Sequence, residues 1–265
     1  MVNSTLGGLI KDYRTQKGIS QLDISFALGW KEPSRLSRIE QGKTEKPPRE
    51  LIDKIIHAIG LEEEEKNILL LTGGYLPTDE EIEKIKQETH NVLEEWLYPA
   101  TLSDFSWRAI TSNHHHTNIY NIGLEEGRLL HKLKPRVLDI FFNFLPKKMD
   151  VVQGKETEYW WNFLKMLILN FKYEQRHRTK EKWYIDHVKE LMKNDMFREL
   201  WVETDIRDRL QGVIGKSLLT SIPVPKTSDG KLLNFFMFSV PVLVDPRFEI
   251  QLFVPRDSET HKYFQ

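Results

Sequence analysis

Short apolar stripes at helical spacing, separated by glycines, characterise the first 75 residues. The first stripe predicts a helix that ends near Gly18, and it consists of Leu6, Leu9, Ile10 and Tyr13. Further stripes predict a helix capped by Ser20, one beginning at Pro33, one over 51–59 and one over 68–71. Five short helices, with a tight turn between the second and third, are typical of a helix-turn-helix domain.

The later part of the chain combines alternating segments with longer helical stripes. Residues 98–113 predict two short strands around a turn that contains an aspartate. Amphipathic helices are predicted over 160–171, 183–191 and 197–201. Antiparallel strands are predicted over 213–224, 232–244 and 248–254, with turns at Ser228-Asp229-Gly230 and Asp245-Pro246. The expected fold class is α+β, with an N-terminal five-helix domain followed by an antiparallel sheet with covering helices.

A cluster of helix-breaking residues, 72–77, separates these two parts. Six of the seven tryptophans lie beyond residue 90, so the two parts also differ in composition. We therefore expect a first domain at 1–76, a helical connector at 77–95 and a second domain at 96–265.

Composition excludes several classes of protein. The 265 residues contain no cysteine, which excludes disulfides, Cys-ligated metal sites and a cysteine nucleophile. No apolar run approaches the ~20 residues that span a bilayer, and the first residues do not resemble a signal peptide. We expect a cytoplasmic protein without membrane association.

Charge is distributed unevenly although the total is close to neutral. The whole chain has 38 Lys and Arg residues against 39 Asp and Glu residues, a formal charge of −1. Residues 1–49 have nine basic and five acidic side chains, a local charge of +4. The local asymmetry is therefore more informative than the total charge.

Three segments carry a family resemblance: Gly18-Ile19-Ser20-Gln21, Leu28-Gly29 and residues 33–42. Together they closely resemble the Cro/repressor-type (XRE) helix-turn-helix family over about 65 residues. Ser25 departs from the alanine usual in the family, and the turn at 30–32 is slightly longer. The resemblance implies a transcription regulator that binds a double-stranded DNA operator through its third helix. Because such a domain reads one half-site, a homodimer is expected.

The third helix offers the candidate base-contacting side chains. At ~100° per residue, Ser34, Arg38 and Gln41 point away from its apolar residues, and Ser37 lies at the edge. Arg38 suits the O6/N7 pair of guanine. Arg35 is at the flank and could contact a phosphate or a base, while the resemblance assigns Gln21 to phosphate. The full predicted DNA-binding set is Gln21, Lys31, Ser34, Arg35, Ser37, Arg38, Gln41, Lys43, Thr44, Lys46 and Arg49. The alternative is an ordinary solvated surface.

The resemblance also implies a structural ion pair between Arg14 and Glu40. We assign both residues to architecture and not to DNA contact. Lys17, in contrast, is expected to be an ordinary exposed charge.

A second resemblance rests on Pro99-Ala100, Asp104, Trp107, Asn113 and the run 197–201. These residues resemble the PAS-like ligand-binding domain of XRE regulators in the MmyB-like group, over residues 90–256. The resemblance implies an effector pocket between helices and sheet that takes a fatty-acid or acyl-like ligand. Candidate wall residues are Phe105, Trp107, Trp161, Phe236 and Phe238, and the alternative for each is core packing.

No catalytic or metal-binding signature is evident. The run His114-His115-His116 cannot converge on one ion, because consecutive side chains diverge, so a solvated loop is expected. We expect no cofactor and no enzymatic activity. Two alternatives remain open: a metabolite-binding protein or enzyme with an accessory helix-turn-helix, and an antitoxin-like regulator that binds a protein partner without a small-molecule ligand.

Overall fold

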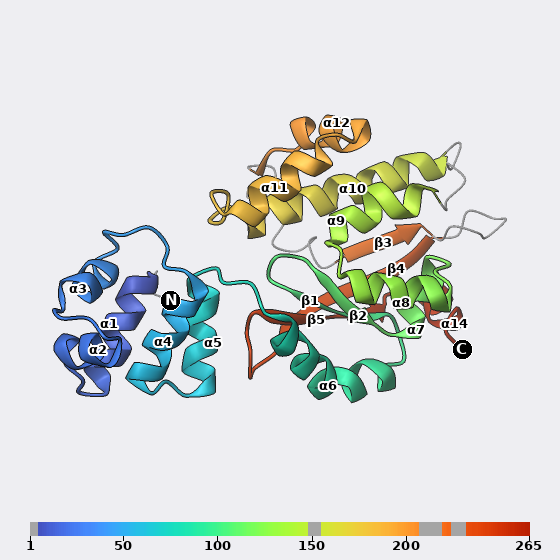
Figure 1. Cartoon of the computed structure of the whole chain (residues 1–265). Coiled ribbons are helices and arrows are strands. Elements are labelled where there is room, and N and C mark those ends of the chain that lie inside the picture. The colour runs from blue at the N-terminus through green and yellow to red at the C-terminus, as the bar shows by residue number, and fades with distance from the viewer. Residues whose placement is uncertain (1–4, 148–154, 207–218, 224–231) are drawn as a thin grey trace. The chain divides into compact units, whose positions relative to one another are not determined.

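The computed structural model describes residues 5–147, 155–206, 219–223 and 232–265 (Figure 1). They form two compact units. The first contains Met1–Pro77 and Pro241–Arg247, and the second contains Thr78–Val240 and Phe248–Gln265. No helix among the described residues is long and apolar enough to cross a membrane.

Five helices form the first unit, as the sequence predicts. They are α1 (Leu6–Gln16), α2 (Gln21–Ala27), α3 (Ser34–Glu40), α4 (Arg49–Ile59) and α5 (Glu63–Thr72). Ser20 caps α2 with a reciprocal capping box that involves Asp23. Gly29 ends the turn after α2 at a φ of 74°, a conformation that glycine adopts without strain.

The core of the first unit joins all five helices. Its fully buried residues include Ile10, Ile24, Leu36, Ile52 and Leu69. Helix α1 packs on α3 and α5, and α2 packs on α3 and α4. The α2–α3 pair therefore has the helix-turn-helix arrangement on a support of three further helices.

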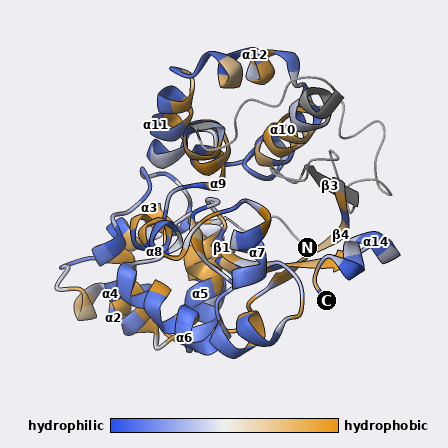
Figure 2. Cartoon of the chain, turned by 90° about the vertical axis from the view of Figure 1, so that its right-hand side faces the viewer, coloured by the Kyte–Doolittle hydropathy of each residue, from blue (hydrophilic) through white to orange (hydrophobic). Residues whose placement is uncertain are grey.

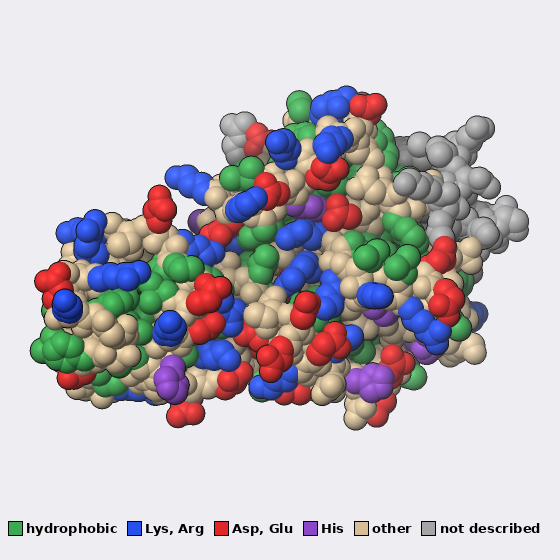
Figure 3. Space-filling view, in the orientation of Figure 1, with side chains coloured by type: hydrophobic (Ala, Val, Ile, Leu, Met, Phe, Trp, Pro, Cys, Tyr) green, Lys and Arg blue, Asp and Glu red, His purple; other side chains and the backbone are tan. Residues whose placement is uncertain are grey.

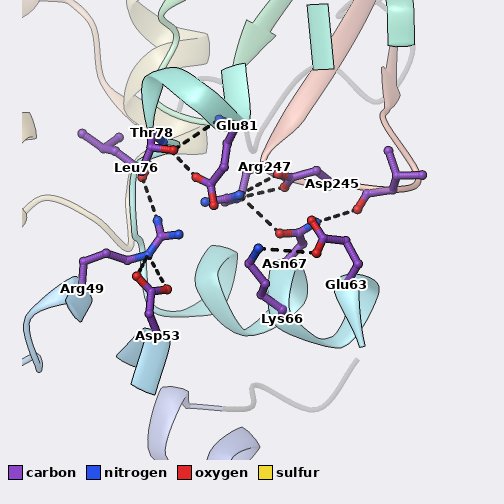
Figure 4. Close-up of polar contacts among 11 residues, drawn as sticks. Arg49, Asp53, Glu63, Lys66, Asn67, Leu76, Thr78, Glu81, Asp245 and Arg247 are labelled. Atoms are coloured by element: carbon purple, nitrogen blue, oxygen red, sulfur yellow. Dashed lines mark hydrogen bonds and ion pairs between the residues drawn. The ribbon is translucent and has the colours of Figure 1, made fainter. Parts of the chain in front are cut away.

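Pro241–Arg247 completes the first unit and is held by a polar cluster on α5 (Figure 4). The Asn67 side-chain amide donates to the carbonyl of Val244 (2.7 Å) and accepts from Arg247 Nη2 (3.3 Å). Arg247 also donates to both carboxylate oxygens of Asp245, at 2.9 and 2.7 Å. The side chains of Arg247 and Asp245 are 0% and 4% exposed. This segment is therefore fixed by a buried ion pair.

The second unit is an α+β structure built on one antiparallel sheet. It begins with α6 (Asp79–Glu95), β1 (Ala100–Asp104), β2 (Ala109–Ser112), α7 (His114–Ile119) and α8 (Leu124–Leu133). Then follow α9 (Val137–Asp139), a π-helical turn (Ile140–Phe144), a 3₁₀ turn (Leu145–Lys147), α10 (Lys155–Glu174), α11 (Lys182–Leu191) and α12 (Asp195–Glu203). The last elements are β3 (Leu219–Pro223), β4 (Leu232–Pro241), β5 (Phe248–Pro255) and α14 (Ser258–Lys262).

Within the described ranges the sheet has five strands, in the order β2-β1-β5-β4-β3. The strand expected over 213–224 is present in its described part as β3, and the turn expected at Ser228-Asp229-Gly230 lies outside the described residues. The prediction of an α+β fold is confirmed. The π-helical turn is a feature that the sequence pattern did not indicate.

Alternation along the strands determines which side chains meet the helices. Thr101 pairs with Gln251, so both point to the same face of the sheet. On that face Phe235 and Phe253 belong to a core cluster with side chains of α10, α11 and α12. Hydrophobic and hydrophilic residues alternate around α10 and α12, as expected for helices with one buried side (Figure 2).

Candidate DNA-binding surface and effector cavity

Helix α3 presents one side to its own core and the other to solvent. Leu36, Ile39 and Glu40 are buried. The exposed residues are Ser34, Arg35, Arg38 and Gln41, and Ser37 is intermediate. The helical spacing predicts this orientation. The exposed side is therefore free to lie along a groove of DNA.

Three of these exposed side chains are positioned by neighbours. The Arg35 guanidinium lies 4.5 Å from the Trp30 ring centroid, so the lengthened turn supports it. The Ser34 hydroxyl donates to Glu32 (2.8 Å), and the Gln41 amide donates to Ser37 (2.8 Å). The Arg38 side chain makes no hydrogen bond or ion pair with the described residues, and its backbone carbonyl accepts from Lys43 N. Its guanidinium is thus the freest candidate for a base edge.

Glu40 organises the contact between the ends of α1, α2 and α3. Its carboxylate accepts from Arg14 Nε (2.7 Å) and Nη2 (3.1 Å), and Arg14 Nη1 donates to the carbonyl of Ile19 (2.8 Å). The Arg14 and Glu40 side chains are 12% and 2% exposed. The expected structural pair is therefore confirmed. Gln21 joins it, because its amide donates to Glu40 Oε2 at 2.7 Å.

Ser25 replaces the expected alanine without leaving an unsatisfied group. The residue is fully buried, and its hydroxyl donates to the carbonyl of Gln21 at 2.8 Å. The prediction for Lys17 is wrong. Its ammonium group donates to the carbonyl of Gly60 (2.6 Å) and forms an ion pair with Glu65 (2.9 Å), so it joins α1 to the α4–α5 turn.

The remaining predicted DNA-contacting residues fall into two groups. Lys31, Lys43 and Thr44 are exposed. Lys46 instead donates to the carbonyl of Gly74 (3.0 Å), and Arg49 pairs with Asp53 (2.9 Å), so both contact the unit itself. Basic side chains are interspersed with acidic ones across the face in Figure 3, which agrees with the near-neutral total.

A cavity of about 120 Å³ lies in the second unit between the sheet and its covering helices. Thr101, Ser103 and Gln251 contribute from the sheet. Helices α7, α8 and α10 contribute the opposite wall, which includes His116, Tyr120, Gly127, Leu130, Phe163 and Leu167. Its surface is mainly apolar with several polar groups, a composition typical of small-molecule sites.

Trp107 is held in the wall by the turn between β1 and β2. Its φ is 64°, a region where a bulky residue is a true outlier. The buried Asp104 fixes this turn, because its carboxylate accepts from Ser106 N (2.9 Å), Arg108 N (3.1 Å) and Arg108 Nε (2.5 Å). The indole N–H then donates to Glu174 of α10 at 2.7 Å. The strain is concentrated at a residue that lines the cavity.

Asn113 positions the helix that carries two further wall residues. Its side-chain oxygen accepts from Ala100 N and His116 N, both at 3.1 Å, and its amide donates to the carbonyl of Tyr98 (2.7 Å). Asn113 thereby caps α7. The loop expected at 114–116 is wrong: the cap places these histidines in the first turn of a helix, and His116 faces the cavity.

Burial controls the charge of the cavity wall. Burial, with a smaller effect of His131, lowers the pKa of His116 to about 3. Burial also lowers the pKa of His131, and Lys86 contributes to that shift. Burial raises the pKa of Tyr120. Around neutral pH these three side chains therefore carry no charge.

Of the five candidate wall residues, Trp107 is among the residues that line the cavity. Phe105 packs against Trp183 at 6.2 Å between ring centroids, and Trp161 lies at the edge of the core. Phe236 and Phe238 are not among the lining residues, and β4 presents Met237 there instead. Ser103, Gly127 and Met237 are among the lining residues that the sequence did not single out, although alternation from Thr101 points to Ser103.

Comparison with known proteins identifies the N-terminal part. Residues 5–69 match the family model described as a helix-turn-helix domain. The match covers α1 to α4 and most of α5, and it supports a DNA-binding regulator. No curated protein matches the chain.

Proposed function

We propose that this protein is a sequence-specific, DNA-binding transcription regulator whose second unit binds a small apolar effector. The main support is the match of residues 5–69 to a helix-turn-helix domain. In this domain Arg38 of α3 is exposed, and the Arg14–Glu40 ion pair holds the buried side of α3 against α1. A rigid helix with an exposed guanidinium is suited to major-groove readout. The protein has a binding role in this proposal and no catalytic one.

The effector half of the proposal is supported by the cavity. It lies between the sheet and the helices, where the MmyB-like resemblance implies a pocket for a fatty-acid or acyl-like compound. The strained Trp107 and the antiparallel sheet with its covering helices support the same proposal. An effector alters DNA binding only through its different affinity for two forms of the protein.

Chain connectivity supplies a candidate route between effector and DNA. Strands β4 and β5 carry the wall residues Met237 and Gln251, and the segment that connects them belongs to the first unit. A change in the cavity that alters these two strands would therefore act on Pro241–Arg247. We propose a homodimer as the DNA-bound form, because two half-sites require two copies of α3.

Selection of bound sequences from a random DNA duplex pool tests the DNA half. We expect enrichment of a motif with two half-sites about one helical turn apart. Arg38→Ala should relax one base position and cost ~1–3 kcal/mol on the selected site. Lys43→Ala is the matched control and should weaken binding to all sequences alike. A pool without an enriched motif contradicts the proposal.

Titration with fatty acids and acyl compounds, followed by tryptophan fluorescence and by operator affinity, tests the effector half. Saturable binding together with a changed operator affinity is the expected result. Binding without such a change would leave a ligand-binding domain and remove the sensor.

A further inference from the structure

We propose that the cavity takes a compact, uncharged molecule, an alcohol, phenol, ketone or ester, whose oxygen hydrogen-bonds the Ser103 hydroxyl. The inference rests on the proposed effector function and narrows its ligand class. It excludes a free carboxylate inside the cavity. The observations that carry it are the cavity's size, its charge and two residues of its wall.

The size of the cavity limits the ligand. Its volume is about 120 Å³, while an apolar cavity of ~150 Å³ in another protein holds one benzene molecule. Pockets for larger ligands occupy roughly 300–1,000 Å³. A long acyl chain would therefore require the wall to part by a large amount, whereas the space is close in size to a single ring or a short chain.

The charge of the wall excludes an anion. Among the described residues that line the cavity there is no Lys or Arg, and the one acidic residue is Glu174. His116 and His131 are held neutral by burial. A carboxylate in this space would lose its hydration without gaining a cationic partner, which is strongly unfavourable. Basic side chains do line a separate open groove, formed partly by Lys86, Arg128 and Lys132, which shares only His131 with the cavity.

Ser103 supplies a buried polar group without a protein partner. The residue is 3% exposed, and its hydroxyl forms no hydrogen bond with any described atom. An unsatisfied buried hydroxyl is unfavourable, and a ligand oxygen would satisfy it. Strand alternation puts Ser103 on the same face of β1 as Thr101, which also lines the cavity.

Gly127 keeps the space open. It lies inside α8, where its φ is not among the positive values, so the backbone does not require glycine. A Cβ at this position would meet only Thr117 Cγ2 at 3.8 Å and Ile122 Cγ2 at 4.0 Å, which are ordinary contacts. Glycine in a helix interior is less favourable than alanine. The absent side chain is therefore best explained by the space that it leaves in the wall.

Calorimetric titration of the full chain with benzyl alcohol, benzoate and toluene tests the inference. Benzyl alcohol and benzoate differ little in size but differ in charge, and toluene lacks the oxygen. We expect benzyl alcohol to bind at least tenfold more tightly than benzoate. Ser103→Ala should weaken benzyl alcohol about two- to tenfold, the range for one net hydrogen bond, and leave toluene unchanged. Ser258→Ala, which makes the same change at an exposed position, should alter neither affinity.

Gly127→Ala is a second test variant, and we expect this substitution to stabilise the fold. Its added methyl group should raise the melting temperature while it lowers the affinity for both benzyl alcohol and toluene. Loss of affinity in a more stable protein cannot result from unfolding. Unchanged affinity in this variant would overturn the assignment of the cavity.

Decanoate in the same titration separates failure of the inference from failure of the proposed function. If decanoate or benzoate binds as tightly as benzyl alcohol, and Arg128→Gln weakens that binding, the ligand is anionic and the inference is wrong while the effector function stands. If decanoate binds and none of benzyl alcohol, benzoate and toluene does, the proposal of a compact ligand is likewise wrong. If none of the four compounds binds, both the inference and the effector function are contradicted.

Discussion

Gln21 donates its side-chain amide to the same Glu40 oxygen that accepts from Arg14, at 2.7 and 3.1 Å. The resemblance assigns Gln21 to phosphate and Arg14 and Glu40 to architecture, but the three side chains form one network. The Gln21 amide has a second N–H, so contact with Glu40 leaves one donor for a phosphate oxygen. A single carboxylate thus joins the side chain at the start of α2 that is predicted to contact DNA to the end of α3.

The network predicts a large energetic coupling between Arg14 and Glu40. Replacing either residue alone by alanine should cost ~3–5 kcal/mol of stability, because the remaining charge is left in a nearly buried site. Chemical denaturation of the two single variants and the double variant measures the coupling. Lys11→Ala, an exposed change on the same helix, is the control, since Lys17 has partners of its own. A double-mutant cycle without interaction energy would show the pair to be incidental.

The close contact between α1 and α3 requires glycine at position 7. A Cβ on Gly7 would lie 2.3 Å from the Ile39 carbonyl oxygen and 2.7 Å from that of Glu40. Backbone atoms cannot rotate away, so Gly7→Ala should destabilise the first unit by ~1–3 kcal/mol or more and weaken operator binding by displacing α3. Gly8→Ala is the matched control, because its Cβ would meet only the Thr5 hydroxyl at 3.2 Å. Equal melting temperatures for the two variants would contradict the argument.

The face of α3 could be predicted from the sequence, whereas several neighbours of that helix could not. Leu36 and Ile39 fix the buried side of a seven-residue helix, so the exposed set follows from helical geometry. Lys17 was misjudged because its partners, Gly60 and Glu65, are more than 40 residues away in the sequence. Local spacing contains no information on such contacts.

The cavity wall was less predictable for a different reason. Residues 235–238 of β4 are all apolar, so the sequence does not reveal which alternate residues face the helices. Met237 faces the cavity, and the predicted wall residues Phe236 and Phe238 are its neighbours in the strand. The histidine run was misread because the decisive residue, Asn113, precedes it and acts as a cap. The positive φ of Trp107 depends on the Asp104 turn and has no signature in composition.

The buried Asp245–Arg247 ion pair should contribute strongly to the stability of the first unit. Asp245→Ala removes the carboxylate that accepts two hydrogen bonds from the fully buried guanidinium of Arg247 and a third from its backbone N–H. The change should cost about 3 kcal/mol, because a buried guanidinium loses its main counter-charge. The double variant Asp245→Ala, Arg247→Met removes the charge as well and should recover part of the loss in thermal denaturation. A double variant less stable than Asp245→Ala would contradict this account.

His187 predicts a loss of stability in mild acid. Its side chain is 4% exposed in α11, its Nε2 atom has no described partner, and its Nδ1 atom lies 3.6 Å from Asp139 Oδ1. Burial, aided by Arg136, lowers its pKa to about 3 in the folded protein. The unfolded chain binds a proton at this histidine below its ordinary pKa of ~6.5, whereas the folded protein does not do so until the pH approaches 3.

The contribution of neutral His187 to the free energy of unfolding is therefore complete above its pKa in the unfolded chain. It is lost as the pH falls toward its pKa in the folded protein. Between about pH 7 and pH 5 the loss should be on the order of 2 kcal/mol. His116 contributes in the same direction, and burial raises the pKa of Asp139, so the wild-type slope combines several groups. Comparison with His187→Phe isolates one of them. Denaturation of both proteins across this pH range should give a shallower slope for the variant, and identical slopes would show that His187 takes up its proton at the same pH in the folded and the unfolded protein.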